Sequence, residues 1–398
     1  MHPYAFLSAL LWGAPESPST SGQKPLSSTY DVTKQGVSTA FFASLERMAR
    51  LVDVAYCVGT TGVSSPFSCA SRCNEFPTVE LIRTWNTGIL LSDSCGFVAV
   101  DHGLTQSKDG EIAHKPEIVI AFRGTYSITN TVVDLSTVPQ EYVPYPAPGD
   151  SDEDRDGDKP ERRCSNCTVH TGFLASWTSA RELVLPALQE ARAKHPDYRI
   201  HLVGHSLGGA VAALAALELK LSAGLHDVRV TTFGEPRVGN SQLAKYIDVV
   251  FGLDHDDKDD SDLESRSYRR VTHANDPVPL LPLTEWGYRS HGGEVFISKP
   301  SLQPAPEDLR VCRGRQDPQC IADADSGEYL LFLTVLMRGE ETESQVETWT
   351  AKLGVSSRLQ LWQLFFAHRD YFWRLGLCVP GGDPTNWGRG RYQFGDEL

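Results

Sequence analysis

The feature that most constrains this chain is a five-residue turn, Gly204-His205-Ser206-Leu207-Gly208, between a strand-like and a helix-like segment. Upstream, residues 198–203 (YRIHLV) are β-branched and apolar enough for a central parallel strand. Downstream, residues 210–221 (AVAALAALELKL) are rich in alanine and leucine, which favours a buried helix. Such a sharp turn needs almost no side chain on either side of the serine, and it raises the serine hydroxyl above the sheet. Ser206 is therefore predicted to be a nucleophile.

A nucleophilic serine needs a base and a group that orients the base. Asp276 follows a strand-like run, Tyr268 to Val271, so its carboxylate is expected just beyond a strand end. His368 comes later, and the order Ser, Asp, His is the one expected of an α/β-hydrolase arrangement. The residues alone leave alternatives open. An aspartate before proline is often only a turn former, and His273 and His291 are credible rivals for the base.

Seven motifs follow one another along the chain: Arg83 to Thr87 (RTWNT), Ala121 to Thr125 (AFRGT), Val169 to Leu174 (VHTGFL), the turn at Ser206, Gly234 to Asn240 (GEPRVGN), Asn275 to Pro279 (NDPVP) and His368 to Phe372 (HRDYF). In this order they resemble the motifs of the filamentous-fungal class 3 lipases, a family that includes lidded triacylglycerol lipases and is related to feruloyl esterases. The resemblance implies that Ser206, Asp276 and His368 form the catalytic triad and that His291 is not the base.

The resemblance also implies the fold, which is α/β of the α/β-hydrolase type. We expect a mostly parallel central sheet with helices on both faces and a lid over the active site. The chain is divided into a weakly signal-like N-terminal segment (1–37), a single catalytic domain (38–380) and a C-terminal tail (381–398). Tyr4 to Ala14 has the length of a signal's apolar region, but no Lys or Arg precedes it.

Acyl transfer needs hydrogen-bond donors for the negative charge that develops on the carbonyl oxygen. The backbone N–H of Leu207, the residue after the nucleophile, is one predicted donor. By resemblance, the second is the backbone N–H of Thr125, which follows the strand-like residues 118–122. Asp134 is predicted to accept a hydrogen bond from the Thr125 hydroxyl and so to fix its rotamer.

Residues 126–135 (YSITNTVVDL) form a short amphipathic segment that matches the lid of the family's lipases. An apolar inner face closes over an apolar cleft and is released when it meets an oil surface, so lipid drives the opening. An ordinary amphipathic loop helix is the alternative. The apolar side chains expected at the substrate are Tyr126, Ile128, Val132 and Val133, and Leu135 completes the pattern.

Three insertions enlarge the domain. Residues 147–163 and 254–266 are acidic and nearly free of apolar side chains, so solvated loops are expected. Residues 327–355 contain an apolar run, Tyr329 to Met337, and two interpretations stay open: a genuine helical hairpin near the active-site rim, or a translated intron. The net charge of −14 argues against nucleic acid and against attraction to anionic membranes. We expect a monomer with no stable membrane anchor.

Nine cysteines indicate an oxidising compartment, because their spacing fits disulfides better than zinc or redox chemistry. The C-x-x-C pair Cys164 and Cys167 is expected to form a local bridge, which leaves Cys95 free or exchanging with that pair. The resemblance implies the other pairs: Cys57 with Cys378, Cys69 with Cys73, and Cys312 with Cys320.

Together these features predict a secreted, extracellular carboxylic ester hydrolase that works through an acyl-enzyme without a cofactor or metal. The favoured activity is that of a triacylglycerol lipase at a lipid–water interface. The alternatives are a feruloyl or other aryl esterase on the same scaffold, or a secreted lipid-binding protein with an inactive triad.

Overall fold

The computed structural model describes residues 36–88, 93–105, 112–125, 135, 142–144, 164–253, 263, 265–274, 276–321 and 366–380. All of them belong to one compact unit, Gln35–Leu398. Several predicted features lie outside the described residues: the lid residues Tyr126, Ile128, Val132 and Val133, the supporting residue Asp134, the insertions 147–163 and 327–355, most of 254–266, the segment 1–35 and the tail 381–398.

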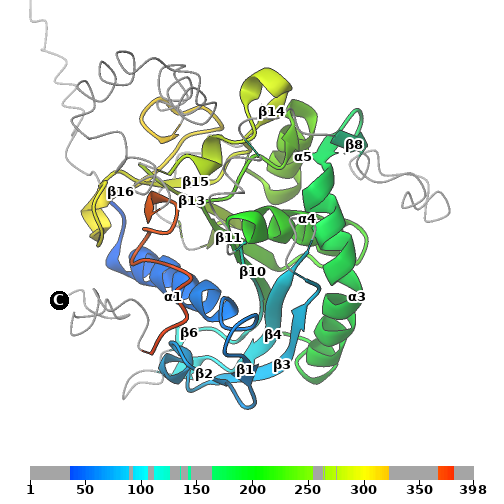
Figure 1. Ribbon diagram of the computed structural model, residues 1–398, viewed down its shortest axis with the longest axis vertical. Coiled ribbons are helices and arrows are strands. Elements are labelled where there is room, and N and C mark those ends of the chain that lie inside the picture. The colour runs from blue at the N-terminus through cyan, green and yellow to red at the C-terminus, as the bar shows by residue number, and fades with distance from the viewer. Residues whose placement is uncertain are drawn as a thin grey trace, which may run out of the picture. The chain divides into compact units, whose positions relative to one another are not determined.

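An eight-stranded sheet forms the centre of this unit, and its five middle strands run parallel (Figure 1). The edge strands pair antiparallel to their neighbours. The predicted mostly parallel sheet is therefore confirmed. In spatial order the strands are β16 (Leu309–Val311), β15 (Glu294–Ile297), β13 (Tyr268–His273), β11 (Val228–Phe233), β10 (Arg199–His205), β7 (Glu117–Phe122), β4 (Cys95–Asp101) and β3 (Val79–Asn86).

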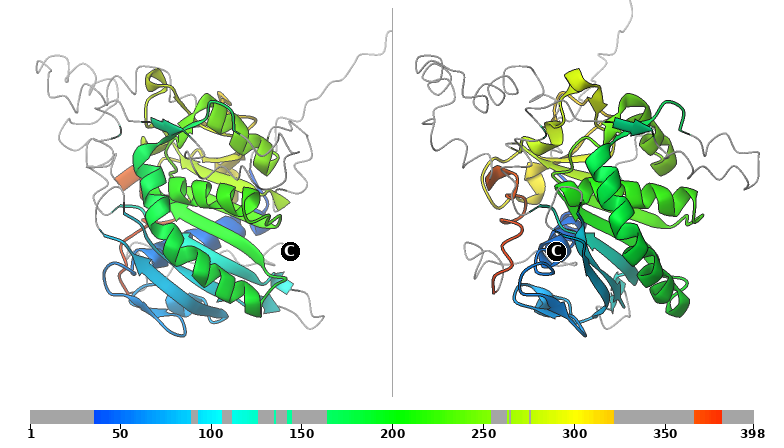
Figure 2. Two further views of the ribbon diagram at one scale, coloured as in Figure 1. Left: turned by 90° about the vertical axis from the view of Figure 1, so that its right-hand side faces the viewer. Right: turned by 45° about the vertical axis from the view of Figure 1, so that its right-hand side comes forward.

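Helices cover both faces of the sheet, because alternate side chains of each buried strand point to opposite sides. Along β7, Ile118 and Ile120 pack in the core beneath α3 (Thr171–Lys194) and α4 (Leu207–Leu221). Val119 and Ala121 pack on the other side, in the core beneath α1 (Thr39–Ala55). Figure 2 shows α3 and α4 across one face, with α1 behind the sheet.

The remaining elements are small and lie around the main sheet. A four-stranded antiparallel sheet has the order β14 (Tyr288–Arg289), β12 (Gly239–Asn240), β9 (Thr168–His170) and β8 (Tyr142–Pro144). Two hairpins pair β1 (Val63–Ser64) with β2 (Ser68–Cys69) and β5 (Leu104–Thr105) with β6 (Ile112–His114). The other helices are α5 (Ser241–Phe251) and the 3-10 turns η1 (Cys73–Glu75), η4 (Val278–Leu280), η5 (Thr284–Trp286) and η6 (Pro306–Asp308).

One predicted boundary at the serine turn needs correction. β10 does not end at residue 203 but continues to His205, so that Gly204 belongs to the strand. The helix α4 begins at Leu207, which is the helix start that the predicted oxyanion donor requires. Ser206 is thus the single residue between strand and helix.

One disulfide and one buried carboxylate connect the segment 366–380 with α1. The structure joins Cys57, just after α1, to Cys378, with 5.2 Å between their Cα atoms. On the preceding turn of α1, the buried carboxylate of Asp53 accepts a hydrogen bond of 2.6 Å from the backbone N–H of Gly376. The end of α1 therefore fixes the segment that carries His368.

His170 caps α3 through its ring. Its Nδ1 accepts hydrogen bonds from the backbone N–H groups of Gly172 (3.1 Å) and Phe173 (3.3 Å), and the ring stacks on Phe173. Only the neutral imidazole can accept at this nitrogen. Burial lowers the pKa of His170 to about 4, which keeps the ring neutral at neutral pH.

We therefore expect His170→Asn to make the free energy of unfolding depend less on pH below about pH 6.5. Unfolded histidine titrates near pH 6.5, so the stabilisation is complete above that pH and is lost as pH falls through the folded pKa of about 4. Between pH 6.5 and pH 4, the free energy of unfolding of the wild type should fall by up to about 3 kcal/mol more than that of the variant. Asparagine can serve as the cap, since Asn240 caps α5 through Leu243 N–H at 3.0 Å. Urea unfolding at several pH values measures this, and parallel pH profiles would contradict it.

Candidate active site

Ser206 sits at a strained point of the backbone between β10 and α4. Its φ of 58° and ψ of −131° lie in a region that costs a non-glycine residue roughly 1–3 kcal/mol. A side chain on Gly204 would collide with the backbone of Gly208, and one on Gly208 would lie 2.5 Å from the carbonyl oxygen of Phe122. Strand, helix and the end of β7 therefore meet at distances that only glycine permits. This geometry is the one expected of a nucleophile turn.

Asp276 and His368 are brought together although 92 residues separate them. His368 Nδ1 lies 2.9 Å from both carboxylate oxygens of Asp276. A carboxylate only accepts, so Nδ1 carries the proton and Nε2 keeps its lone pair. Asp276 follows the end of β13, where the backbone N–H of Val278 donates to its Oδ1 at 2.9 Å. The pair is thus oriented for base catalysis at Nε2.

Two buried polar atoms at this site have no hydrogen-bond partner in the described part of the chain. They are the Oγ atom of Ser206 and the Nε2 atom of His368, and both residues are fully buried. Buried polar groups are nearly always satisfied, and exceptions concentrate where chemistry occurs. These two atoms are the ones that the sequence predicts to exchange a proton.

His205 links the histidine segment to the serine turn. Its Nε2 lies 2.8 Å from the carbonyl oxygen of His368, and its ring stacks on the His368 ring with 4.7 Å between centroids. A carbonyl only accepts, so Nε2 carries the proton and Nδ1 accepts from the hydroxyl of Tyr56 at 2.5 Å. Burial lowers the pKa of His205 well below its usual value, so the ring stays neutral. The sequence predicted no role for Tyr56.

Tyr371 donates a second side-chain hydrogen bond to the aspartate. Its hydroxyl lies 2.5 Å from Oδ2 of Asp276, and the residue is fully buried. Burial and the neighbouring carboxylate raise the pKa of Tyr371 well above its usual value, so it remains a donor. Tyr371 falls within the HRDYF motif, yet only the fold shows that its hydroxyl reaches Asp276.

Gly234 follows β11 and lies against the pair. A Cβ atom here would stand 2.7 Å from His368 Cε1, 2.7 Å from the Tyr371 hydroxyl and 2.8 Å from Asp276 Oδ2. Its φ is +59°, a conformation that also favours glycine. The motif GEPRVGN therefore begins with a residue that leaves room for the aspartate and the histidine.

The predicted oxyanion donors lie beside the serine. Leu207 is the first residue of α4, so its backbone N–H belongs to the helix N-terminus. Thr125 follows β7, and its neighbour Gly124 is close enough to the turn that an added Cβ would lie 2.8 Å from Ser206 Cβ. The structure therefore brings the segment of Thr125 to Ser206, whereas Asp134 lies outside the described residues. Leu135, the last residue of the predicted lid, is buried in the core beside α3 and α4.

The rival histidines have other partners. His291 Nε2 lies 2.8 Å from the buried carboxylate of Glu235, and its Nδ1 lies 2.9 Å from the Gly292 carbonyl oxygen. His273 Nε2 lies 2.9 Å from the carbonyl oxygen of Lys299. Neither ring takes the position that His368 occupies on Asp276.

The structure contains four disulfides within the described residues, and none touches the triad. Besides Cys57–Cys378 they are Cys69–Cys73, Cys164–Cys167 and Cys312–Cys320. Cys95 is a buried free thiol whose pKa burial raises, so it is poorly suited to exchange. In the described part of the chain, no group of three His, Cys, Asp or Glu side chains is placed to hold a metal ion.

Comparison with known proteins points to one family. The family model described as lipase (class 3) matches residues 119–286. A secreted mono- and diacylglycerol lipase 2 from Gibberella zeae is 58% identical over 381 residues, which cover 95% of this chain and 91% of the relative. A secreted mono- and diacylglycerol lipase A from Penicillium camembertii is 34% identical over 69% of this chain and 75% of the relative. Among solved structures, the nonglycosylated LIP2 lipase of Yarrowia lipolytica superposes with a TM-score of 0.64 at 29% identity, over 86% of this chain and 97% of that chain.

Tyr371→Phe should lower kcat/KM on a soluble p-nitrophenyl ester about tenfold or more. The change removes one hydrogen bond to a charged acceptor, which contributes roughly 1.5–3 kcal/mol. Tyr246→Phe is the matched control, because the Tyr246 hydroxyl is buried without a partner among the described residues. Equal kinetics for the two variants would show that Tyr371 does not position Asp276.

Gly234→Ala should lower turnover of the same ester about a hundredfold, since the added methyl group displaces His368 or Asp276. Gly252→Ala is the control for backbone strain. Gly252 has a φ of +64°, but no atom of the described residues lies within 4 Å of an added Cβ. The positive φ should cost both variants about 1–2 kcal/mol in the free energy of unfolding. Gly234→Ala should lose roughly 1–3 kcal/mol more through overpacking, and only this variant should lose turnover. Similar turnover in both would refute the steric argument.

Proposed function

The chain belongs to the class 3 lipase family, and we propose that Ser206, His368 and Asp276 cleave the ester bonds of acylglycerols at a lipid–water interface. The protein is a secreted serine ester hydrolase of the lipase type. The observation that carries the proposed site is the Asp276–His368 pair beside the strained serine turn, with Ser206 Oγ and His368 Nε2 both buried and unpartnered in the described residues.

In the proposed mechanism, Ser206 Oγ attacks the ester carbonyl while His368 Nε2 takes its proton. The Asp276 carboxylate holds the Nδ1 proton and stabilises the imidazolium that forms. The backbone N–H groups of Leu207 and Thr125 donate to the oxyanion. His368 then protonates the leaving alcohol, and water attacks the acyl-enzyme with His368 again as the base.

The hydrogen bonds around the pair support this assignment. Asp276 accepts from Tyr371 and from the Val278 N–H, so its charge is stabilised although it is buried. The carbonyl oxygen of His368 is fixed by His205, the residue that directly precedes Ser206. The base is therefore held by the same strand end that presents the nucleophile, which limits the freedom lost in the transition state.

Lipid esters are the substrate class, and the feruloyl or aryl esterase alternative is not favoured. The sequence analysis favours triacylglycerols as substrates, whereas two similar proteins are named as mono- and diacylglycerol lipases. We propose that partial glycerides are also substrates. No helix among the described residues is long and apolar enough to cross a membrane. A monomeric state, the absence of nucleic-acid and membrane-anchor contacts, and a lid over residues 126–135 remain part of the proposal.

A substrate panel tests the function. Emulsified tributyrin, dioctanoylglycerol and monooctanoylglycerol should each be hydrolysed at least about tenfold faster than methyl ferulate. The tributyrin rate should rise once its concentration passes the solubility limit, because an interface releases the lid. Ser206→Ala should lose about 10⁶-fold in kcat and all fluorophosphonate labelling. Ser222→Ala, at the other end of α4, is the control that should keep both. Faster cleavage of methyl ferulate than of every glyceride would overturn the proposal.

A further inference from the structure

A cavity with a volume of about 410 Å³ lies between α5, β13, β14 and the disulfide loop 312–320. The triad does not line it. Its described lining contains five cationic side chains and one carboxylate: Arg237, Lys245, Arg270, Arg289, Arg315 and Glu294. This excess of positive charge is notable in a chain whose net charge is −14. A cavity of this size and charge is suited to a small anion.

Arg270 is the buried member of this set. The residue is 1% exposed, and its Nη2 donates to Glu294 Oε2 at 3.1 Å. Its Nε and Nη1 atoms have no hydrogen-bond partner within the described residues. An arginine stays charged at every working pH, so these buried N–H groups are costly unless they bind an acceptor.

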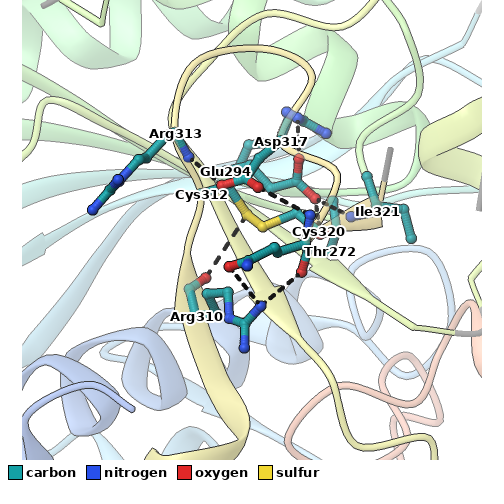
Figure 3. Close-up of a disulfide and its surroundings, with 10 residues drawn as sticks. Thr272, Glu294, Arg310, Cys312, Arg313, Asp317, Cys320 and Ile321 are labelled. Carbon is teal, nitrogen blue, oxygen red and sulfur yellow. Dashed lines mark hydrogen bonds and ion pairs between the residues drawn. A yellow bond between two sulfur atoms is a disulfide. The ribbon is translucent and has the colours of Figure 1, made fainter. Parts of the chain in front are cut away.

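Glu294 contacts Arg270 through Oε2 alone, because other donors occupy its second carboxylate oxygen. Its Oε1 accepts from the Thr272 hydroxyl at 2.6 Å and from the Ile321 backbone N–H at 3.2 Å (Figure 3). Ile321 directly follows the Cys312–Cys320 bridge. The single carboxylate of the cavity is therefore used to attach the disulfide loop as well as to pair with Arg270.

Backbone carbonyl oxygens accept hydrogen bonds from two of the other arginines of the cavity. Arg289 Nη1 donates to the carbonyl oxygens of Thr284 and Tyr288, both at 2.7 Å. Arg237 Nη1 donates to the carbonyl oxygen of Pro282 at 3.0 Å. These guanidinium groups are therefore oriented in advance, which reduces the entropy that a ligand must overcome.

Arg315 comes from the disulfide loop, whose shape is fixed. Within the loop, the Asp317 carboxylate accepts from the backbone N–H groups of Arg313 (2.9 Å) and Gln319 (3.0 Å) (Figure 3). Arg315 Nε also pairs with Asp248 at 3.2 Å, and its side chain is 34% exposed. The loop therefore presents a partly accessible guanidinium group at the cavity.

We propose that this cavity is a binding site for a phosphate group, either free phosphate or the phosphomonoester of a lipid headgroup. Phosphate matches the guanidinium fork and carries up to two negative charges, which suits a lining whose described residues include five cations and the one carboxylate of Glu294. This site is distinct from ester hydrolysis and does not depend on the proposed triad.

Isothermal titration with sodium phosphate, at an ionic strength held constant with sodium chloride, tests the site in the full chain. Arg289→Gln/Arg315→Gln should weaken phosphate binding about a hundredfold, or about tenfold for each guanidinium removed. Arg315→Gln alone is the less disruptive variant and should cost about tenfold. Arg313→Gln is the matched control, because it removes the same charge from the same loop but does not line the cavity.

Vesicles distinguish the two sources of phosphate. With the Ser206→Ala protein, tighter binding to phosphatidic acid than to phosphatidylglycerol vesicles, competed by phosphate and lost in Arg315→Gln, would support a lipid headgroup. Phosphate binding without that vesicle preference would support free phosphate. If the wild type binds no phosphate at a concentration of about 10 mM, which exceeds the millimolar dissociation constant of a weak complex, the proposal is overturned. An equal loss in Arg313→Gln and Arg315→Gln would also overturn it.

Discussion

The close approach of β10, α4 and the end of β7 around Ser206 is the constraint on which the rest of the structure depends. Gly204 and Gly208 let the backbones meet, and Ser206 takes a positive φ that costs free energy locally. The fully buried strand and the alanine-rich helix on either side stabilise that conformation, because neither can shift without opening the core. The turn therefore has a fixed position in the sheet before any catalytic partner is added.

The second half of the site is attached to this turn through buried polar contacts. The segment 366–380 is joined to α1 by the Cys57–Cys378 bridge and by the Asp53 carboxylate. His205 and Tyr56 then connect the His368 carbonyl with the end of α1. These contacts place His368 beside the end of β10, next to Ser206. Chain-entropy arguments assign such a long closed loop about 5 kcal/mol of stabilisation.

The buried charged residues around Glu235 and Arg270 follow a different pattern. The buried carboxylate of Glu235 accepts hydrogen bonds from Thr232, Tyr268 and His291, so groups within the fold stabilise its charge. Around Arg270 the described donors outnumber the acceptors. The same physical rule, that buried charge needs partners, explains the stability of the first cluster and motivates a ligand for the second.

The sequence by itself determined the main local elements of this protein and predicted the groups that we propose to be reactive. The strand and helix around Ser206 were readable because their composition is local, although the strand extends two residues beyond its predicted end. The order of Ser206, Asp276 and His368, together with the resemblance, selected His368 as the predicted base over His273 and His291.

Only the tertiary structure decided which side chains meet across long separations in the sequence. Tyr56, His205 and Tyr371 acquire their roles from contacts between strand ends, α1 and the segment 366–380, and no local pattern encodes such contacts. The same holds for Gly234 and for the cationic cavity, because the space beside a glycine and the balance of buried charges depend on how separate elements pack.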